Sequence, residues 1–156
     1  MPLDVIDIRE FYASTLGRVT QDRLSEMLRE AWPRTQGLSV MGLGFAIPYL
    51  DQFRDEADRV ISVMPERQGV IEWPQGGPSA SILAAPGALP LPDSSIDRVL
   101  VIHALETQDR PQDLLSELWR VLTPGGHAIV ITPNRSGLWA RIDRTPFGHG
   151  QPFSRR

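Results

Sequence analysis

The sequence predicts an α/β fold built on a doubly wound, mostly parallel sheet, and three observations support this prediction. Strand-like and helix-like apolar patterns alternate along the 156 residues, as they do when helices cover both faces of a parallel sheet. Gly42 and Gly44 end one apolar strand, and Pro48 follows where a helix would begin. The run Ile96–Ile102 is apolar enough for a central strand that is covered on both faces.

Two helices are predicted before the first strand. Apolar residues recur at helical spacing over residues 4–16, and Gly17 is a natural stop. Thr20 can cap a second helix that extends to the Trp-Pro pair following Ala31. Its expected buried stripe consists of Leu24, Met27, Leu28 and Ala31. Residues 1–34 are therefore expected to form a helical preface to the sheet.

Five strands are predicted, at residues 38–43, 59–63, 79–84, 96–102 and 127–132. Three prolines and three glycines in residues 64–78 exclude a long helix there, so the third strand is expected at an edge. Helices are expected from Pro48 to about Ala57, and from an Asp109 cap to Leu122, where residues 123–126 end the second one. Residues 38–134 are thus expected to form the core of the fold.

The turn after the first strand is the first candidate binding site. Residues 38–50 contain a strand, a glycine turn and a helix start in close succession. Such a turn lies at the carboxyl end of a parallel strand and points a helix N-terminus toward a ligand. A nucleotide-type ligand that contacts backbone at Gly42 and Gly44 is therefore expected here.

Composition excludes several classes of chemistry. The length fits one domain, residues 1–156. The absence of cysteine excludes disulfides and thiolate catalysis, and His103, His127 and His149 lack metal-ligand spacing, so no metal site is expected. All sixteen basic residues are arginine, which excludes Schiff-base lysines. There is no run of 18 apolar residues and no charged-then-apolar leader, so we expect a cytoplasmic protein without a membrane segment.

The net charge of −3 conceals an asymmetry. Five of the sixteen arginines follow Asn134 and only Asp143 opposes them, so this tail carries +4 and the body −7. The five are Arg135, Arg141, Arg144, Arg155 and Arg156. A solvated loop region and contact with an anionic ligand are both open interpretations. We predict no appreciable nucleic-acid binding, because the acidic body opposes phosphate and no basic–aromatic alternation accompanies the arginines.

Three motifs together carry a family resemblance. They are Leu89-Pro-x-Pro-Asp93-x-x-Ile96-Asp97, the strand end His103-Ala-Leu-Glu106, and the helix Leu115-x-Glu117-x-Trp119-Arg120-Val-Leu-x-Pro-Gly-Gly126. With these motifs in this order, residues 38–156 resemble class I S-adenosylmethionine-dependent methyltransferases, and most closely the branch often called type 11. The resemblance implies a Rossmann-like methyltransferase fold whose seven strands end in a reversed hairpin after strand five.

That final hairpin is missing from the predicted elements. Ser154 aligns with the cap of the helix that precedes strand six in the family, so we expect this chain to be a truncated form. Residues 135–156 would then be an incomplete lid or substrate-side segment, to which Trp139 and His149 are expected to contribute. Strand five would lie at an open edge, and open edges recruit other chains. Homo-oligomers or aggregates are therefore expected.

The resemblance also implies site residues. Gly44 would let the S-adenosylmethionine cofactor approach the backbone, and Leu89 would form the adenine wall. His103, beyond strand four, would lie near the transferred methyl group. It is a weak candidate for a general base, and the alternative is a histidine satisfied by backbone. No other catalytic residue is identified.

The departures from the family pattern concern cofactor contacts. The first motif resembles an acidic residue followed by three alternating glycines, and of the corresponding Gly42, Gly44, Ala46 and Pro48 one matches. The carboxylates that hold the ribose and adenine would fall at Met64 and Ala85, with Glu66 and Asp93 as possible substitutes. Losing the ribose contact removes a charge-assisted hydrogen bond of roughly 1.5 to 3 kcal/mol. Cofactor binding that is weak or absent is consistent with this pattern.

Two functions follow. The first is methyl transfer from S-adenosylmethionine to a small-molecule or otherwise unidentified substrate. The alternative is a catalytically inactive methyltransferase-fold protein that serves as a binding or scaffolding partner. The sequence alone also predicts that Met64→Asp restores roughly 1 to 3 kcal/mol of cofactor affinity.

Overall fold

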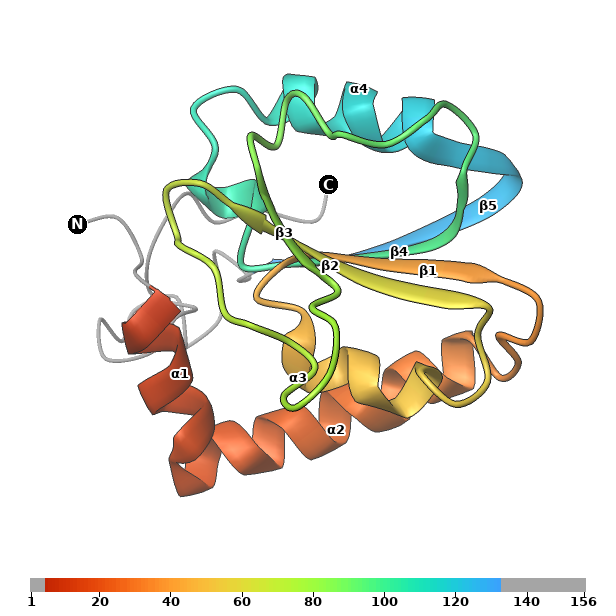
Figure 1. Cartoon of the computed structure of the whole chain (residues 1–156). Helices are drawn as coiled ribbons and strands as arrows, with labels where there is room; N and C mark the ends of the chain where they lie inside the picture. Colours follow the sequence, from red (N-terminus) through yellow and green to blue (C-terminus); the bar gives the residue numbers. More distant parts are fainter. Residues whose placement is uncertain (1–4, 133–156) are drawn as a thin grey trace, which may run out of the picture.

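The five predicted strands form one parallel sheet in a computed structural model that describes residues 5–132 (Figure 1). The strand order is β3-β2-β1-β4-β5, and each adjacent pair is parallel. Their bounds are β1 Ser39–Gly44, β2 Arg59–Pro65, β3 Ser81–Ala84, β4 Ile96–Ile102 and β5 Leu122–Ile131. The predicted doubly wound α/β fold is confirmed, and β3 lies at an edge as expected.

Helices cover both faces of this sheet. Their bounds are α1 Val5–Ala13, α2 Thr15–Ala31, α3 Ile47–Leu50 and α4 Pro111–Val121, with short 3-10 helices at Asp51–Phe53 and Leu105–Thr107. Figure 1 shows α2 and α3 on one face, α4 on the other, and α1 beside the end where the strands finish. None of the described helices is long and apolar enough to cross a membrane.

The central strands explain why the sheet needs both layers. Along β4, Val99 and Val101 belong to the apolar core under α4, whereas Leu100 and Ile102 belong to the core under α2 and α3. This alternation follows from the two-residue period of a strand. Because both faces are covered, the run appears continuously apolar in sequence.

The helical preface begins differently from the prediction. Ser14 caps α2, because its Oγ accepts a hydrogen bond from the Gly17 amide at 3.0 Å. Gly17 is therefore inside α2 rather than at a helix end, and Thr20 is a helical residue rather than a cap. Within the predicted stripe only Leu28 is fully buried, and Met27 is 52% exposed. Ser14, immediately after the end of α1, is a better cap here because the chain turns sharply between the two helices.

The helix after β1 is shorter than predicted. It ends at Leu50, continues as the 3-10 turn Asp51–Phe53, and does not reach Ala57. Ala57 instead forms an isolated antiparallel bridge with Gln36. Between Phe53 and this bridge the chain continues in turns, in which the Ala57 amide donates to the Phe53 carbonyl at 2.9 Å.

The segment around α4 also corrects two predictions. Arg110 occupies the cap position and makes no side-chain capping bond, whereas Asp109 pairs with Arg67 at 3.0 Å. The last strand begins at Leu122 instead of His127, because Leu122 already pairs with β4. Residues 123–126 therefore form an irregularity inside β5, where the register with β4 shifts, rather than the turn that ends the helix.

Strand β5 lies at the other edge of the sheet formed by the described residues. Val130 on this strand is 40% exposed. The predicted association of copies through this edge stays a prediction. The expectations for residues 135–156, including Trp139, His149, Ser154 and the arginine-rich tail, lie outside the described residues.

Candidate functional site

The turn between β1 and α3 lies where the strand order reverses direction. Gly44 has φ +87°, a left-handed conformation that side chains rarely adopt. A Cβ on Gly44 would also lie closer than 3.0 Å to the carbonyl oxygen of Ile102. The Phe45 amide donates to that same oxygen at 3.0 Å. The turn is thus fixed against the end of β4, at the crevice where open α/β sheets bind ligands.

Gly42 contributes to the same turn through packing. A Cβ on Gly42 would lie closer than 3.0 Å to side-chain atoms of both Ala46 and Leu50. The glycine therefore lets α3 pack directly on β1. This contact sets the angle at which α3 leaves the sheet, and it accounts for Gly42 without a ligand.

The end of β2 offers apolar atoms instead of a carboxylate. Met64 is completely buried in the core under α2 and α3, and its Sδ accepts a hydrogen bond from the Ile71 amide at 3.3 Å. Ala85, after β3, is partly buried. Of the two carboxylates considered as substitutes, Glu66 is exposed and Asp93 is bonded to Arg120 at 2.7 Å.

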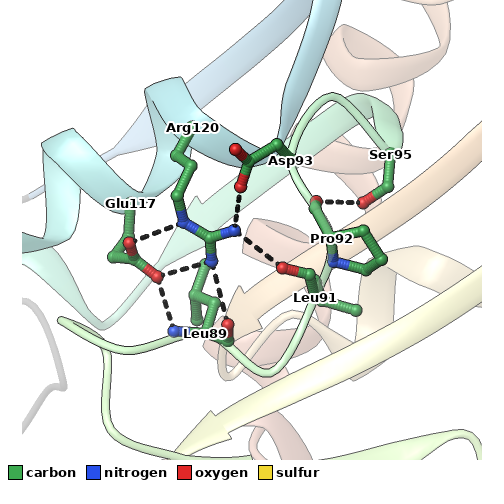
Figure 2. Close-up of polar contacts among 7 residues, drawn as sticks. All are labelled: Leu89, Leu91, Pro92, Asp93, Ser95, Glu117 and Arg120. Atoms are coloured by element: carbon green, nitrogen blue, oxygen red, sulfur yellow. Dashed lines mark hydrogen bonds and ion pairs between the residues drawn. The ribbon is translucent and has the colours of Figure 1, made fainter.

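Arg120 on α4 joins the two most specific sequence motifs (Figure 2). Its Nε and Nη2 donate to the two carboxylate oxygens of Glu117, each at 2.8 Å. Its Nη1 donates to Asp93 at 2.7 Å and to the Leu91 carbonyl at 2.8 Å, and Nη2 donates to the Leu89 carbonyl at 3.0 Å. The guanidinium thereby fixes the loop after β3 onto α4.

Glu117 completes this motif clip, as we term the contacts of Leu89, Leu91 and Asp93 with Glu117 and Arg120. The Leu89 amide donates to Glu117 Oε2 at 2.7 Å. The hydrogen bond from Arg120 lowers the pKa of Glu117, and the backbone donor acts in the same direction. Leu89 itself is buried in the core under α4. The loop that would border an adenine is therefore held in a fixed position by α4.

Asp97 fastens the opposite end of the strands. One carboxylate oxygen accepts from the Ser39 amide at 2.8 Å, and the other accepts from the Thr123 hydroxyl at 2.9 Å. Because Ser39 begins β1 and Thr123 belongs to β5, this carboxylate ties together three neighbouring strands. Its role in the described structure is to set the register of the sheet.

His103 lies directly after β4, within the crevice and fully buried. Its backbone is left-handed, with φ 54°. Its Nε2 lies 3.0 Å from the Tyr12 hydroxyl of α1, and the Tyr49 hydroxyl of α3 donates to Tyr12 at 2.7 Å. The side chain is thus held by a phenol, which neither of the two interpretations from sequence had included.

A carboxylate lies on the other side of the same ring. Glu106 Oε1 is 3.6 Å from His103 Nδ1, and the Glu106 side chain is 2% exposed. Neither of its oxygens accepts a hydrogen bond from residues 5–132. The side-chain amide of Gln68 donates to the His103 carbonyl. Residues from four separate segments therefore converge on this histidine.

Burial keeps both phenols of this group protonated. It raises the pKa of Tyr49 to about 12, against a smaller opposing effect of its hydrogen bond to Tyr12. It raises the pKa of Tyr12 further, and the neighbouring Tyr49 and Glu106 add to that effect. Both groups are therefore hydrogen-bond donors at neutral pH. Within the described part of the chain, no three His, Cys, Asp or Glu side chains are grouped so as to hold a metal ion.

The comparison with protein families assigns this architecture. The methyltransferase-domain model Methyltransf_11 matches residues 40–130, which is more than half of the chain. The chain is a class I S-adenosylmethionine-dependent methyltransferase family member. The resemblance inferred from the three motifs is confirmed, and so is the Rossmann-like fold that it implied.

Curated relatives agree with this family. An uncharacterized methyltransferase of Mycobacteroides abscessus is 32% identical over 126 residues, which cover 73% of this chain and 48% of that protein. A demethylmenaquinone methyltransferase of Thermus thermophilus is 31% identical over 133 residues, covering 83% of this chain and 52% of the relative. The chain spans about half the length of the curated relatives it matches.

A solved structure shows the same fold. A methyltransferase of Thermotoga maritima, described as a possible histamine N-methyltransferase, superimposes with a TM-score of 0.65 over 94% of this chain and 68% of its own, at 18% sequence identity. At that identity the likeness establishes the fold alone.

The methyltransferase family implies S-adenosylmethionine as cofactor, and the crevice fits that group in part. The tight Gly44 turn and the fixed Leu89 loop provide backbone and apolar surface at the carboxyl edge of the sheet. Met64 and Ala85 provide no carboxylate for the ribose or the adenine. Any binding here would therefore depend on backbone and apolar contacts.

Tyr12, Tyr49 and Gln68 were not predicted from the sequence to be site residues. Tyr12 belongs to the apolar pattern of the preface, so it was assigned to packing. Tyr49 follows Pro48 in a helix start that looks apolar throughout. Only contacts between residues as far apart as 91 positions reveal that these groups meet. Glu106 did carry a signal, namely a carboxylate that follows a strand end within an apolar stretch.

Proposed function

We propose that this chain forms the cofactor-binding part of a methyltransferase that transfers a methyl group from S-adenosylmethionine to a small-molecule nucleophile. The observation that supports it best is the Gly44 turn, which is fixed against β4 where the strand order reverses. Family membership gives that position its ligand class. The chain covers about half the length of each of these two relatives, so the residues that contact the methyl acceptor in a whole protein are part of the proposal.

The chain's own residues would bind and orient rather than activate the methyl group. The Gly44 turn would contact the cofactor through backbone, and Leu89 would pack against the adenine. His103 lies nearest the end of β4, where we place the methyl acceptor. When bound, S-adenosylmethionine supplies an electrophilic methyl group on a sulfonium. The protein then contributes proximity and exclusion of water.

The acceptor class to test first comes from a relative. The Thermus thermophilus protein is named a demethylmenaquinone methyltransferase. We propose a reduced quinol as the first acceptor, and a small amine as the second because of the Thermotoga maritima description.

A second candidate function rests on Met64. At the end of β2, the buried Met64 stands where the resemblance implies the carboxylate for the ribose. Ala85 stands where it implies the carboxylate for the adenine. Each loss weakens binding by about ten- to hundredfold. These two positions support the alternative, a methyltransferase-fold protein that binds a partner without catalysis. If copies associate through the β5 edge, they would do so under either function.

Calorimetry with S-adenosylhomocysteine tests the proposal. The protein is unfolded and refolded first, so that copurified ligand is removed, and mass spectrometry of the denatured sample identifies any such ligand. The proposed function requires saturable one-site binding that adenosine alone reproduces only weakly. Absence of binding at millimolar S-adenosylhomocysteine would favour the second candidate. Transfer of a labelled methyl group to a reduced naphthoquinol or to histamine then tests catalysis.

A further inference from the structure

The hydrogen-bond network around His103 determines where the proton of the neutral ring lies. Tyr49 donates to the Tyr12 oxygen at 2.7 Å, so that oxygen already accepts one bond. The single hydroxyl hydrogen of Tyr12 then has His103 Nε2, at 3.0 Å, as its acceptor. The reverse arrangement would leave the Tyr12 hydrogen without a partner in a buried site, which is costly. The ring nitrogen that accepts is therefore Nε2, and the ring proton is on Nδ1.

Glu106 supports the same tautomer from the opposite side. Its Oε1 lies 3.6 Å from His103 Nδ1, and the carboxylate is buried without a hydrogen bond from residues 5–132. A buried carboxylate stabilises a nearby N–H and destabilises a nearby lone pair. The Gln68 amide fixes the His103 carbonyl, and the left-handed backbone fixes the direction of the side chain. The ring is thus oriented before any ligand binds.

We propose that Glu106 and Tyr12 are positioning residues. They make His103 Nε2 the atom that takes a proton from the molecule being methylated. Glu106 keeps the proton on Nδ1. Tyr12 occupies Nε2 with its hydroxyl until the N–H or O–H of the acceptor replaces it. This inference rests on the proposed methyltransferase function, and it deepens that function by assigning the proton's destination and the residues that set it.

The proton transfer balances as follows. An electron pair of the acceptor forms the new bond to the methyl carbon: the lone pair of an amine nitrogen, or a ring pair that the quinol hydroxyl supplies to the attacked carbon. The electrons of the broken carbon–sulfur bond remain with the methyl donor. The acceptor's proton moves to Nε2. The ring then carries a positive charge, and its Nδ1 lies 3.6 Å from Glu106 Oε1. A nearby opposite charge stabilises that imidazolium, as the carboxylate of a catalytic triad does.

The packing of Tyr12 and its helix holds the Tyr12 hydroxyl at Nε2. Its ring stacks on Phe45 with centroids 5.5 Å apart and an interplanar angle of 15°. Ile8 and Phe11 of the same helix are buried in the core under α2 and α3. Figure 1 shows α1 at the end of the sheet where the strands finish. An acceptor that replaces the Tyr12 hydroxyl at Nε2 must therefore displace the Tyr12 ring from this packing.

The titratable and polar groups that face the ring come from each neighbouring element. Tyr12 comes from α1 and Tyr49 from α3, and Glu106 comes from the 3-10 helix after β4. Gln68, from the segment after β2, is neutral. Among these four groups Glu106 has the one carboxyl group, so the tautomer should depend on it more than on the other three.

Nitrogen-15 NMR of the histidine rings tests the inference directly. The His103 signals are assigned by elimination, using His127→Gln and His149→Gln proteins. In the unmodified chain, neutral His103 should be the Nδ1–H tautomer by at least about tenfold, whereas the exposed His127 should show no such preference. In Glu106→Gln the ratio should fall by about tenfold. The matched control is Asp109→Asn. It removes one carboxylate from the segment between β4 and α4 that also contains Glu106, but the Asp109 side chain is 78% exposed, so the ratio should stay unchanged.

A second measurement concerns Tyr12. Tyr12→Phe keeps the stacked ring and removes the hydroxyl, so the Nε2 lone pair should become available and its protonation should no longer require displacement of a phenol. The rate of ring N–H exchange with water should then rise by about tenfold or more. A dominant Nε2–H tautomer in the unmodified chain would overturn the inference, as would equal ratios in Glu106→Gln and Asp109→Asn. Failure to bind S-adenosylhomocysteine would refute the proposed function separately, because the tautomer is measured without ligand.

Discussion

Replacing Met64 with aspartate distinguishes the sequence-based view of the site from the structural one. From the sequence alone, a carboxylate at this position should grip the ribose and tighten cofactor binding. In the structure Met64 is completely buried, and its sulfur accepts a hydrogen bond from the Ile71 amide. We therefore expect Met64→Asp to lower the free energy of unfolding, and we expect this loss to outweigh any gain in cofactor affinity.

The expected loss has two parts. Removing a buried methionine side chain and leaving a cavity costs about 2 to 5 kcal/mol. The carboxylate adds the cost of burial, because the Ile71 amide is the donor that the structure places within reach. A total of at least about 4 kcal/mol would remove much of the roughly 5 to 15 kcal/mol by which a domain is stable. Met64→Leu keeps the volume and should cost less than about 1.5 kcal/mol.

Urea unfolding followed by far-UV circular dichroism measures both variants. Burial disfavours the charged carboxyl, so the introduced group should bind a proton more readily than in the unfolded chain, and the deficit of Met64→Asp should shrink as pH falls from about 7 to about 4. A Met64→Asp protein within about 1 kcal/mol of Met64→Leu at pH 7 would refute the placement of this side chain in the core. The same would follow if S-adenosylhomocysteine stabilised Met64→Asp far more than the unmodified chain.

Three further substitutions test the turn and the fastened strands. Gly44→Ala should lower the free energy of unfolding, measured by urea titration, by at least about 3 kcal/mol, because the new side chain combines a strained φ with a clash at the end of β4. Gly37→Ala is the control. Gly37 has φ +71° but open space around it, so this change should cost about 1 kcal/mol. Glu117→Gln should cost about 1 to 2 kcal/mol at pH 7 by urea titration. The bond from Arg120 lowers the pKa of Glu117, so that stability is present above the ordinary value of 4.5 and is lost as pH falls through the lowered one; an unchanged deficit at about pH 3 would contradict it. Asp97→Asn should lower the thermal midpoint by about 4 °C, through about 1 kcal/mol, since one of two donors loses its acceptor.

The sequence predicted the strands better than the helix ends. Residues 96–102 form β4 with the predicted bounds, because a strand covered on both faces has a composition that few other structures tolerate. Helix ends depend on competition among nearby caps. Ser14 and Thr20 are both good caps, and the sharp turn after α1 favours the first. That turn is a tertiary feature which local pattern does not contain.

The candidate site was predictable as a place and less so as a set of contacts. Gly42 and Gly44, at the end of β1, indicated the crevice as the candidate site, because glycine turns at the carboxyl ends of parallel strands are common ligand sites. They could not show that side chains at the start of α3 and within it occupy the space beside Gly42, or that the Tyr12 phenol of α1 contacts His103. Those contacts join residues tens of positions apart. Their partners carry no local signal, because a buried tyrosine in an apolar helix looks like packing.

The motif clip explains how a chain can keep a family signature although Met64 and Ala85 stand where the resemblance implies acidic cofactor contacts. Arg120 and Glu117 hold the loop after β3 through its backbone carbonyls and amide, so they preserve the shape of the crevice whatever it binds. The signature therefore reports a fixed loop rather than chemistry. In our proposal the chemistry depends instead on the polar groups around His103, which belong to a different motif from the clip. Cofactor binding and the state of His103 are for this reason separate questions in this chain, and calorimetry and nitrogen-15 NMR answer them independently.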